Sequence, residues 1–192
     1  MVEKTCLFFA LLAIGCRSPE LQELPAKGEE GVFVVVETPA GSVEVIRYDP
    51  ATQGFAADSG KVAFLPFPGN WGFVPSTHIP YSKGQSFAPV ETLILGKRLE
   101  SGALVEVRLV AAVILSEKGR RSLLTLATPV DTALCNMDIR DFPDLAIGYP
   151  GVKSGLEQWL RQRKGAHPVE VLDWKDGQFA LRFLEASLPK KK

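Results

Sequence analysis

The chain has 192 residues, 46% of them hydrophobic, and its 22 lysine and arginine residues balance 22 aspartate and glutamate residues. This length and composition suit one globular domain that can bury a sizeable core without disulfide staples. The balanced charge argues against a nucleic-acid partner, which would need a basic face, and three cysteines are too few for a disulfide framework.

The first residues have the pattern of a secretory signal. Residues 6–14 (CLFFALLAI) form an apolar run that is too short to span a bilayer, which takes about 20 residues, but fits the hydrophobic region of a signal peptide. Residues 13–16 (AIGC) resemble a bacterial lipobox, whose cysteine is lipidated and becomes the new N-terminus. We predict a lipoprotein signal peptide over residues 1–15 and a membrane-binding lipid on Cys16. The protein would then face the periplasm or the exterior in a bacterial cell envelope. The alternatives are an ordinary signal peptide and a stray apolar N-terminus.

A polar segment comes next and is followed by the first apolar strands. Residues 16–31 are polar, with prolines and glycines and no apolar period, and predict a tether. A single folded domain is predicted over residues 32–192. Residues 32–37 (VFVVVE) predict a central strand, and the alternation over residues 42–48 predicts a half-buried one. Residues 55–63 are predicted as a short loop or hairpin.

Aromatic residues, prolines and glycines are densest over residues 64–95. The prolines and glycines argue against a long helix, and Asn70-Trp71-Gly72 is predicted as a tight turn. Residues 82–88 are predicted as a loop, and the apolar residues 90–95 as a buried strand. Aromatic turns beside a strand are typical of ligand pockets, and equally of plain core.

Regularly spaced strands with turns between them continue the chain, and helices come late. The predicted strands cover residues 103–115, which form one long strand or a strand pair, 122–128 and 169–174, with a turn at 117–121. The predicted helices cover residues 153–164, with Ser154 as its N-cap, and 179–188. Such spacing of strands favours a barrel.

Five segments in order resemble the soluble family I inorganic pyrophosphatases. They are residues 35–40 (VVETPA), 46–49 (IRYD), 67–73 (FPGNWGF), 138–143 (DIRDFP) and 171–174 (VLDW). The resemblance implies an α+β fold with a small closed five-stranded β-barrel of OB-like type, helices packed outside it, and assembly into a homo-oligomer. The family reaction that it implies is the Mg²⁺-dependent hydrolysis of diphosphate to phosphate.

The metal-binding part of the resemblance is depleted. Where the family has Asp-x-Asp-Pro-x-Asp, this chain has SFAPVE, so that Ser86 and Ala88 replace two aspartates and Glu91 replaces the third. Of the two aspartates that follow in the family, Glu117 aligns with one and the uncharged Ser122 with the other. Mg²⁺ takes about six oxygen ligands, and alanine offers none. By resemblance Glu37, Glu91 and Glu117 remain as metal ligands, with weakened attraction for the ion.

The anion-binding part of the resemblance is better kept. Basic side chains that would face phosphate or diphosphate are Arg47, Lys61, Arg163 and Lys164. Glu91 and Tyr48 stand at positions that would take part in catalysis. The alternative is that the basic residues are ordinary solvated surface charges.

Two functions stay open. The first is a lipoprotein without catalysis, or nearly so, that binds phosphate or another anion or serves as an interaction module. The second is an active diphosphatase with a reduced metal set in which Glu91, Glu117 and Asp58 supply the ligation.

Overall fold

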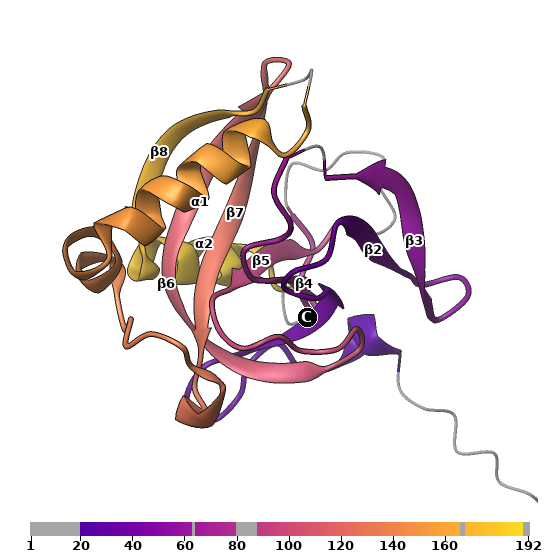
Figure 1. The fold of residues 1–192 in the computed structure, drawn as a ribbon. Coiled ribbons are helices and arrows are strands. Elements are labelled where there is room, and N and C mark those ends of the chain that lie inside the picture. The colour runs from indigo at the N-terminus through magenta and orange to yellow at the C-terminus, as the bar shows by residue number, and fades with distance from the viewer. Residues whose placement is uncertain (1–19, 63, 80–87, 166–167, 190–192) are drawn as a thin grey trace, which may run out of the picture.

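Five strands close into a ring in the computed structural model, which describes residues 20–62, 64–79, 88–165 and 168–189 (Figure 1). Around the ring the order is β1 (Val32–Thr38), β4 (Asn70–Val74), β5 (Val90–Ile94), β7 (Arg120–Pro129) and β6 (Leu104–Glu117). Pairing between β1 and β6 closes it. β5 and β7 run parallel, and the other neighbours are antiparallel. The predicted α+β class and closed five-stranded sheet are confirmed.

The remaining elements lie outside the ring. β8 (Glu170–Asp176) extends the sheet from β6, while β2 (Glu44–Asp49) and β3 (Gly54–Lys61) form a separate hairpin. Two α-helices, α1 (Pro150–Gln162) and α2 (Gly177–Ser187), lie on different sides of the sheet (Figure 1). Short helical turns are η1 (Leu21–Glu23), η2 (Thr132–Leu134) and η3 (Asp144–Gly148). None of the helices in the described part of the chain has the length and apolar character that crossing a bilayer requires.

Apolar side chains of the strands form two main core groups, and each group includes residues of one α-helix. One group centres on Trp71, Leu126 and Trp159, and a second on Val34, Ile94 and Leu184. β5 is a buried strand, as predicted, except at Glu91, whose side chain is 37% exposed. The rings of Phe67, Trp71 and Phe73 are core side chains, 1–5% exposed.

The predicted turn at Asn70-Trp71-Gly72 is wrong, because these residues begin the fully buried strand β4. Gly72 is there for close approach and not for a turn: a Cβ atom at this position would overlap the carbonyl oxygen of Val35 on β1. Of the two alternatives for residues 55–63, the hairpin agrees with the structure: residues 54–61 form the strand β3, which pairs with β2. The tight turn before β7 is shorter than predicted and uses the left-handed residues Lys118 and Gly119.

Both α-helices start earlier than predicted. α1 begins at Pro150, with Tyr149 as its N-cap. Pro fits the first helical position, where its missing N–H has no partner to lose. Ser154 is therefore not a cap; its Oγ donates to Gly151 O within the helix, at 3.2 Å. α2 begins after Asp176, whose carboxylate accepts a hydrogen bond from Phe179 N at 2.8 Å.

The described part of the predicted tether, residues 20–31, packs on the domain. Ala26 is buried in the second core group, and Leu21 and Leu24 contact the group around Tyr48. The backbone N–H groups of Glu30 and Gly31 both donate to the Glu106 carboxylate, at 2.6 and 2.7 Å. The polar composition of this segment does not reveal such packing. The packing is due to three apolar side chains and to backbone hydrogen bonds, which composition does not report.

Candidate functional site

Arg47 lies between two glutamates from different strands. Its Nη1 donates a hydrogen bond to Glu37 Oε2 on β1 at 3.0 Å and another to Glu91 Oε1 on β5 at 2.9 Å. β1 and β5 both pair with β4, where Val35 and Glu91 lie opposite the same residue, Phe73. The Glu37 side chain is 5% exposed, and those of Arg47 and Glu91 are each 37% exposed. One guanidinium thus contacts a buried carboxylate and a partly exposed one.

Trp71 and Arg163 complete a group that we call the Arg47 cluster (Glu37, Arg47, Trp71, Glu91 and Arg163). Arg163 Cζ lies 4.8 Å from the centroid of the Trp71 ring and 5.8 Å from that of Trp159. Arg47 Cζ lies 5.9 Å from the Trp71 centroid. These distances are those of cation–π contacts.

Two buried N–H donors of the Arg47 cluster lack an acceptor. Trp71 Nε1 and Arg163 Nε have no hydrogen-bond partner among the described residues. Leaving a buried donor unpaired costs free energy, and each such group in a native protein calls for an explanation. An acceptor such as a water or an anion oxygen would satisfy both.

A second ion pair lies beside the Arg47 cluster. Lys164 Nζ donates to Glu117 Oε2 at 2.5 Å. Arg163 interacts electrostatically with both Glu91 and Glu117, so it links the two groups of charges. The six charged residues of this region therefore comprise three carboxylates and three basic side chains.

Burial sets the electrostatics of the Arg47 cluster. It raises the pKa of the Glu37 carboxyl above its ordinary value, and attraction to Arg47 offsets this only in part. Burial lowers the pKa of Arg47, but attraction to Glu91 and Glu37 outweighs it, so that the pKa is raised overall. The Arg163 pKa is lowered by burial, against the attraction of Glu91. By contrast, the hydrogen bond from Lys164 lowers the pKa of Glu117.

The structure places Tyr48 differently from its neighbour Arg47. The Tyr48 ring is buried against Phe55 and Phe73, with centroids 5.4 and 5.8 Å away. Successive residues of a strand face opposite ways, so the Arg47 side chain and the Tyr48 ring lie on opposite faces of β2. The Tyr48 backbone does reach the Arg47 cluster, because its N–H donates to Glu37 Oε1 at 2.8 Å.

Other predicted residues fall outside these groups or outside the described atoms. Lys61 ends β3 opposite Glu44, and its side chain is not among those described. Cys16 and Ser86 lie outside the described residues. Ala88 is 8% exposed just before β5. Asp58 is exposed on β3.

The three predicted metal ligands are paired with basic side chains. Glu37 and Glu91 are bound by Arg47, and Glu117 is bound by Lys164. Within the described ranges, no three side chains from histidine, cysteine, aspartate and glutamate are placed to hold a metal ion together. Mg²⁺ prefers near-octahedral oxygen ligands at about 2.0–2.1 Å. These carboxylates are instead arranged around basic side chains of the same protein.

The sequence patterns missed the role of Trp159. Its spacing on α1 predicts only a core position. The residue lies four positions before Arg163, and side chains at this spacing share one helix face. The Trp159 indole N–H donates to Leu65 O at 2.8 Å, and its ring faces Arg163. An arginine four residues after a core tryptophan was the available signal.

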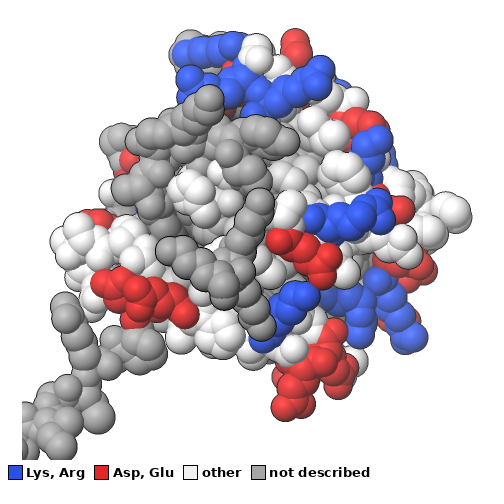
Figure 2. Space-filling view, turned by 180° about the vertical axis from the view of Figure 1, so that it is seen from behind, with Lys and Arg blue, Asp and Glu red and all other residues white. Residues whose placement is uncertain are grey.

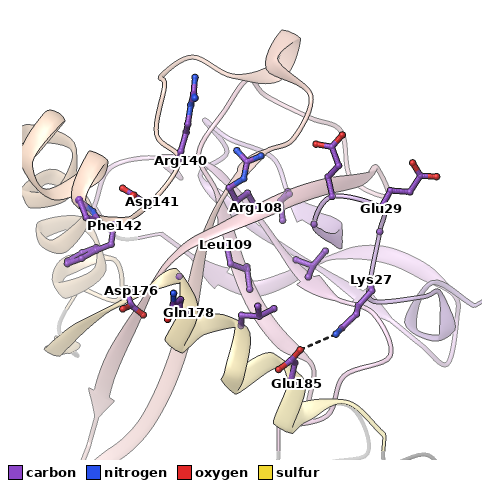
Figure 3. A pocket seen from close by; sticks show the side chains of 18 residues that line it. Lys27, Glu29, Arg108, Leu109, Arg140, Asp141, Phe142, Asp176, Gln178 and Glu185 are labelled. Atoms are coloured by element: carbon purple, nitrogen blue, oxygen red, sulfur yellow. Dashed lines mark hydrogen bonds and ion pairs between the residues drawn. The ribbon is translucent and has the colours of Figure 1, made fainter.

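A separate groove lies away from the Arg47 cluster (Figure 3). Its volume is about 660 Å³, between residues 27–32, β6, the loop before α1 and the start of α2. Arg108, Arg140, Asp176 and Glu185 are among its lining residues, and none of the predicted site residues is.

On the face of the molecule shown in Figure 2, acidic and basic side chains lie next to one another.

Comparisons with known proteins agree on one family. The family profile described as inorganic pyrophosphatase matches residues 34–192. A Thermus thermophilus protein named inorganic pyrophosphatase is 30% identical over 183 residues, which cover 90% of this chain and 98% of that protein. The crystal structure of inorganic pyrophosphatase from T. thermophilus has a TM-score of 0.77 at 26% identity, covering 88% of this chain and 97% of the other. A structure from Coxiella burnetii, also described as an inorganic pyrophosphatase, has a TM-score of 0.73 at 24% identity, covering 86% and 98%, and supports the fold alone.

Proposed function

Because the chain belongs to the inorganic pyrophosphatase family, we propose that it is a divergent member that binds phosphate or another small anion at the Arg47 cluster. On this proposal the family reaction, Mg²⁺-dependent hydrolysis of diphosphate, is weak or absent. The observation that carries the proposal is the position of Arg47, whose Nη1 is bound to both Glu37 and Glu91. Arg47 thereby already offsets part of the negative charge that would attract metal ions.

The unpaired donors support the anion-binding half of the proposal. Trp71 Nε1 and Arg163 Nε are buried without an acceptor among the described residues. A phosphate oxygen is a strong acceptor, and hydrogen bonds from arginine to phosphate are charge-assisted. Lys164 follows Arg163 directly and carries a third positive charge to the same region.

Two assays on the purified full-length protein test the proposal. We expect phosphate release from diphosphate to stay at or close to background with Mg²⁺ present. We expect inorganic phosphate without Mg²⁺ to raise the melting temperature, because a ligand that binds only the native state stabilises it. The Arg163→Gln variant should lose this shift, whereas Arg182→Gln, on an exposed position of α2, should keep it.

The opposite result would establish the active enzyme. Phosphate release that requires Mg²⁺ and falls in Glu91→Gln would overturn the proposal and favour a diphosphatase with the reduced metal set of Glu91, Glu117 and Asp58. Absence of any phosphate-induced shift would overturn the anion-binding half, whatever the turnover.

The lipid anchor is a separate part of the proposal. The apolar residues 6–14 and the AIGC sequence ending at Cys16 support a bacterial lipoprotein in the cell envelope. Metabolic labelling with an alkyne fatty acid should label the wild-type protein and Cys135→Ser, which keeps Cys16. Cys16→Ser should be unlabelled and should leave the membrane fraction. Equal labelling of all three would exclude lipidation at Cys16.

Assembly into a homo-oligomer is also proposed, on the family resemblance alone. Sedimentation equilibrium of the purified protein in detergent should give a protein mass of at least two mature chains. A single species of the chain mass over the accessible concentration range would exclude a stable oligomer.

A further inference from the structure

We infer that the Arg47 guanidinium occupies the position between Glu37 and Glu91 and thereby prevents divalent metal ions from binding to these two carboxylates. The role is one of specificity: the guanidinium selects against metal at a place where two acids converge. The inference deepens the proposed function at the same cluster, and its test uses neither phosphate nor diphosphate.

The geometry makes Arg47 and a metal ion mutually exclusive. Glu37 Oε2 and Glu91 Oε1 both approach one nitrogen, Nη1, at 3.0 and 2.9 Å. A cation that bridges the two carboxylates through these oxygens would take the place of Nη1. Mg²⁺ and Mn²⁺ are hard ions that seek such oxygens at shorter distances, so the guanidinium must leave before either ion can bridge them.

The Glu37 carboxylate and the main chain of Glu91 are held in place independently of Arg47. Glu37 Oε1 accepts the backbone N–H of Tyr48 at 2.8 Å, which fixes the carboxylate. The main chain of Glu91 lies in β5 and accepts a hydrogen bond from Thr125 Oγ1 at 3.0 Å. β1 and β5 flank the same strand, β4. The pair of oxygens should therefore stay close together when the guanidinium is removed.

The surrounding charges reinforce the exclusion. Arg163 is a second guanidinium within electrostatic reach of Glu91 and Arg47. Glu117, which could serve as a third donor, is bound by Lys164. A divalent ion would enter a region where the protein's own basic groups already balance the acids, and like charges at short range repel.

Arg47 keeps donors for an anion while it excludes metal. In the described part of the chain, the hydrogen bonds of Arg47 to the two glutamates both come from Nη1. A guanidinium has five N–H donors in all. Metal exclusion and metal-independent anion binding are therefore compatible in one side chain.

The test is Mn²⁺ binding to full-length variants, measured by the electron paramagnetic resonance signal of free Mn²⁺ and by calorimetry. Arg47→Met removes the charge and keeps an apolar chain. We expect it to bind Mn²⁺ at least about tenfold more tightly than the wild type, because a repulsive charge is lost and two acids are released. Arg98→Met, which changes an exposed arginine that donates to Ala40 O, should bind as the wild type does.

A double variant identifies the ligands. Arg47→Met/Glu91→Gln should return to wild-type affinity, because one of the two carboxylates is lost. Wild-type protein that binds Mn²⁺ as tightly as Arg47→Met would overturn the inference, and so would a gain that survives Glu91→Gln.

Loss of stability in Arg47→Met does not block the test, because the ion should replace the guanidinium. Its melting temperature should rise with Mn²⁺ while that of the wild type stays constant. Failure of Arg47→Met to fold at saturating Mn²⁺ counts against the inference. Failure of the phosphate assays alone would leave it standing, so the two proposals fail separately.

Discussion

Two clusters of this protein contain the same kinds of side chain but differ in burial. The Arg47 cluster combines two glutamates, two arginines and Trp71 across β1, β2, β4, β5 and the end of α1. What we call the Glu157 cluster combines one glutamate, two basic residues and one tryptophan on α1 and β8 (Lys153, Glu157, Arg161 and Trp174). Glu157 Oε1 accepts from Arg161 at 2.8 Å, its Oε2 from Trp174 Nε1 at 3.2 Å, and Lys153 Nζ lies 4.7 Å from the Trp174 centroid.

The two acids respond to these partners in opposite ways. Burial raises the pKa of Glu37, although Arg47 contacts it. Hydrogen bonding from Arg161 lowers the pKa of Glu157, whose side chain is 30% exposed. The contrast teaches that an arginine contact does not by itself decide how costly an acid is to ionise. Where water is excluded, desolvation determines the direction of the pKa shift, and ionisation of the acid depends on its basic partner.

Replacing the tryptophans should give the largest difference between the clusters. Trp71 is 1% exposed, so Trp71→Ala should lower the free energy of unfolding by about 4 kcal/mol through lost burial and a cavity. Trp174 is half-buried on β8, and Trp174→Ala should cost about 2 kcal/mol. Guanidinium-induced unfolding followed by circular dichroism measures both. Equal losses would show that burial does not separate the clusters.

Removing the acids should give a smaller contrast. Glu37→Ala leaves the Tyr48 N–H without its acceptor and Arg47 with one carboxylate, and should cost about 3 kcal/mol. Glu157→Ala breaks contacts near solvent and should cost about 1 kcal/mol or less. The same unfolding experiment applies, with Glu170→Ala on β8 as a neutral surface control. A loss at Glu157 as large as at Glu37 would contradict the comparison.

The sequence predicts much of the fold where local pattern and burial agree. The β-branched residues 32–37 form β1, and the apolar residues 90–95 contain β5. The spacing of the strands favoured a barrel, but ring closure depends on β1 pairing with β6 and on the parallel pairing of β5 with β7, and no local pattern identifies these partners. Gly72 misled the analysis because a glycine needed for close strand approach looks the same in sequence as a turn glycine.

The sequence offered candidate site residues but not their arrangement. Sequence analysis assigned Arg47 to anions and Glu37 and Glu91 to metal. The structure joins all three in one ion-pair group, with partners 10 and 44 residues from Arg47. No local pattern reports contacts over such separations. The family resemblance identified which positions to consider. Which of these side chains form ion pairs depends on how the closed sheet brings the strands together.

Acid should remove the contribution of the Glu157 cluster. The lowered pKa of Glu157 means that the folded protein favours the ionised carboxylate more than the unfolded chain does. Its stabilising contribution is therefore present above the ordinary glutamate pKa of about 4.3 and is lost as the pH falls through the lower folded value. In melting experiments below about pH 4.5, the difference between wild type and Glu157→Gln should shrink. A difference that stays constant down to pH 2 would show that ionisation of Glu157 adds no stability.

Replacing one arginine in each cluster should give the smallest losses of stability and the clearest distinction between the two clusters. Arg161 is 44% exposed and Glu157 keeps Lys153 and Trp174 without it, so Arg161→Ala should cost about 0.5 kcal/mol, less in about 1 M salt. Arg163, two residues on, lies over Trp71 and Trp159. Its packed side chain should make Arg163→Ala the costlier change, with little salt dependence, since stacking and burial are screened less than an exposed ion pair. Both variants remove one arginine from the same end of α1, so net charge cancels from the comparison. If the two losses matched in size and in salt dependence, Arg163 would be an ordinary surface charge, and the Arg47 cluster would lose the member that connects it to Glu117.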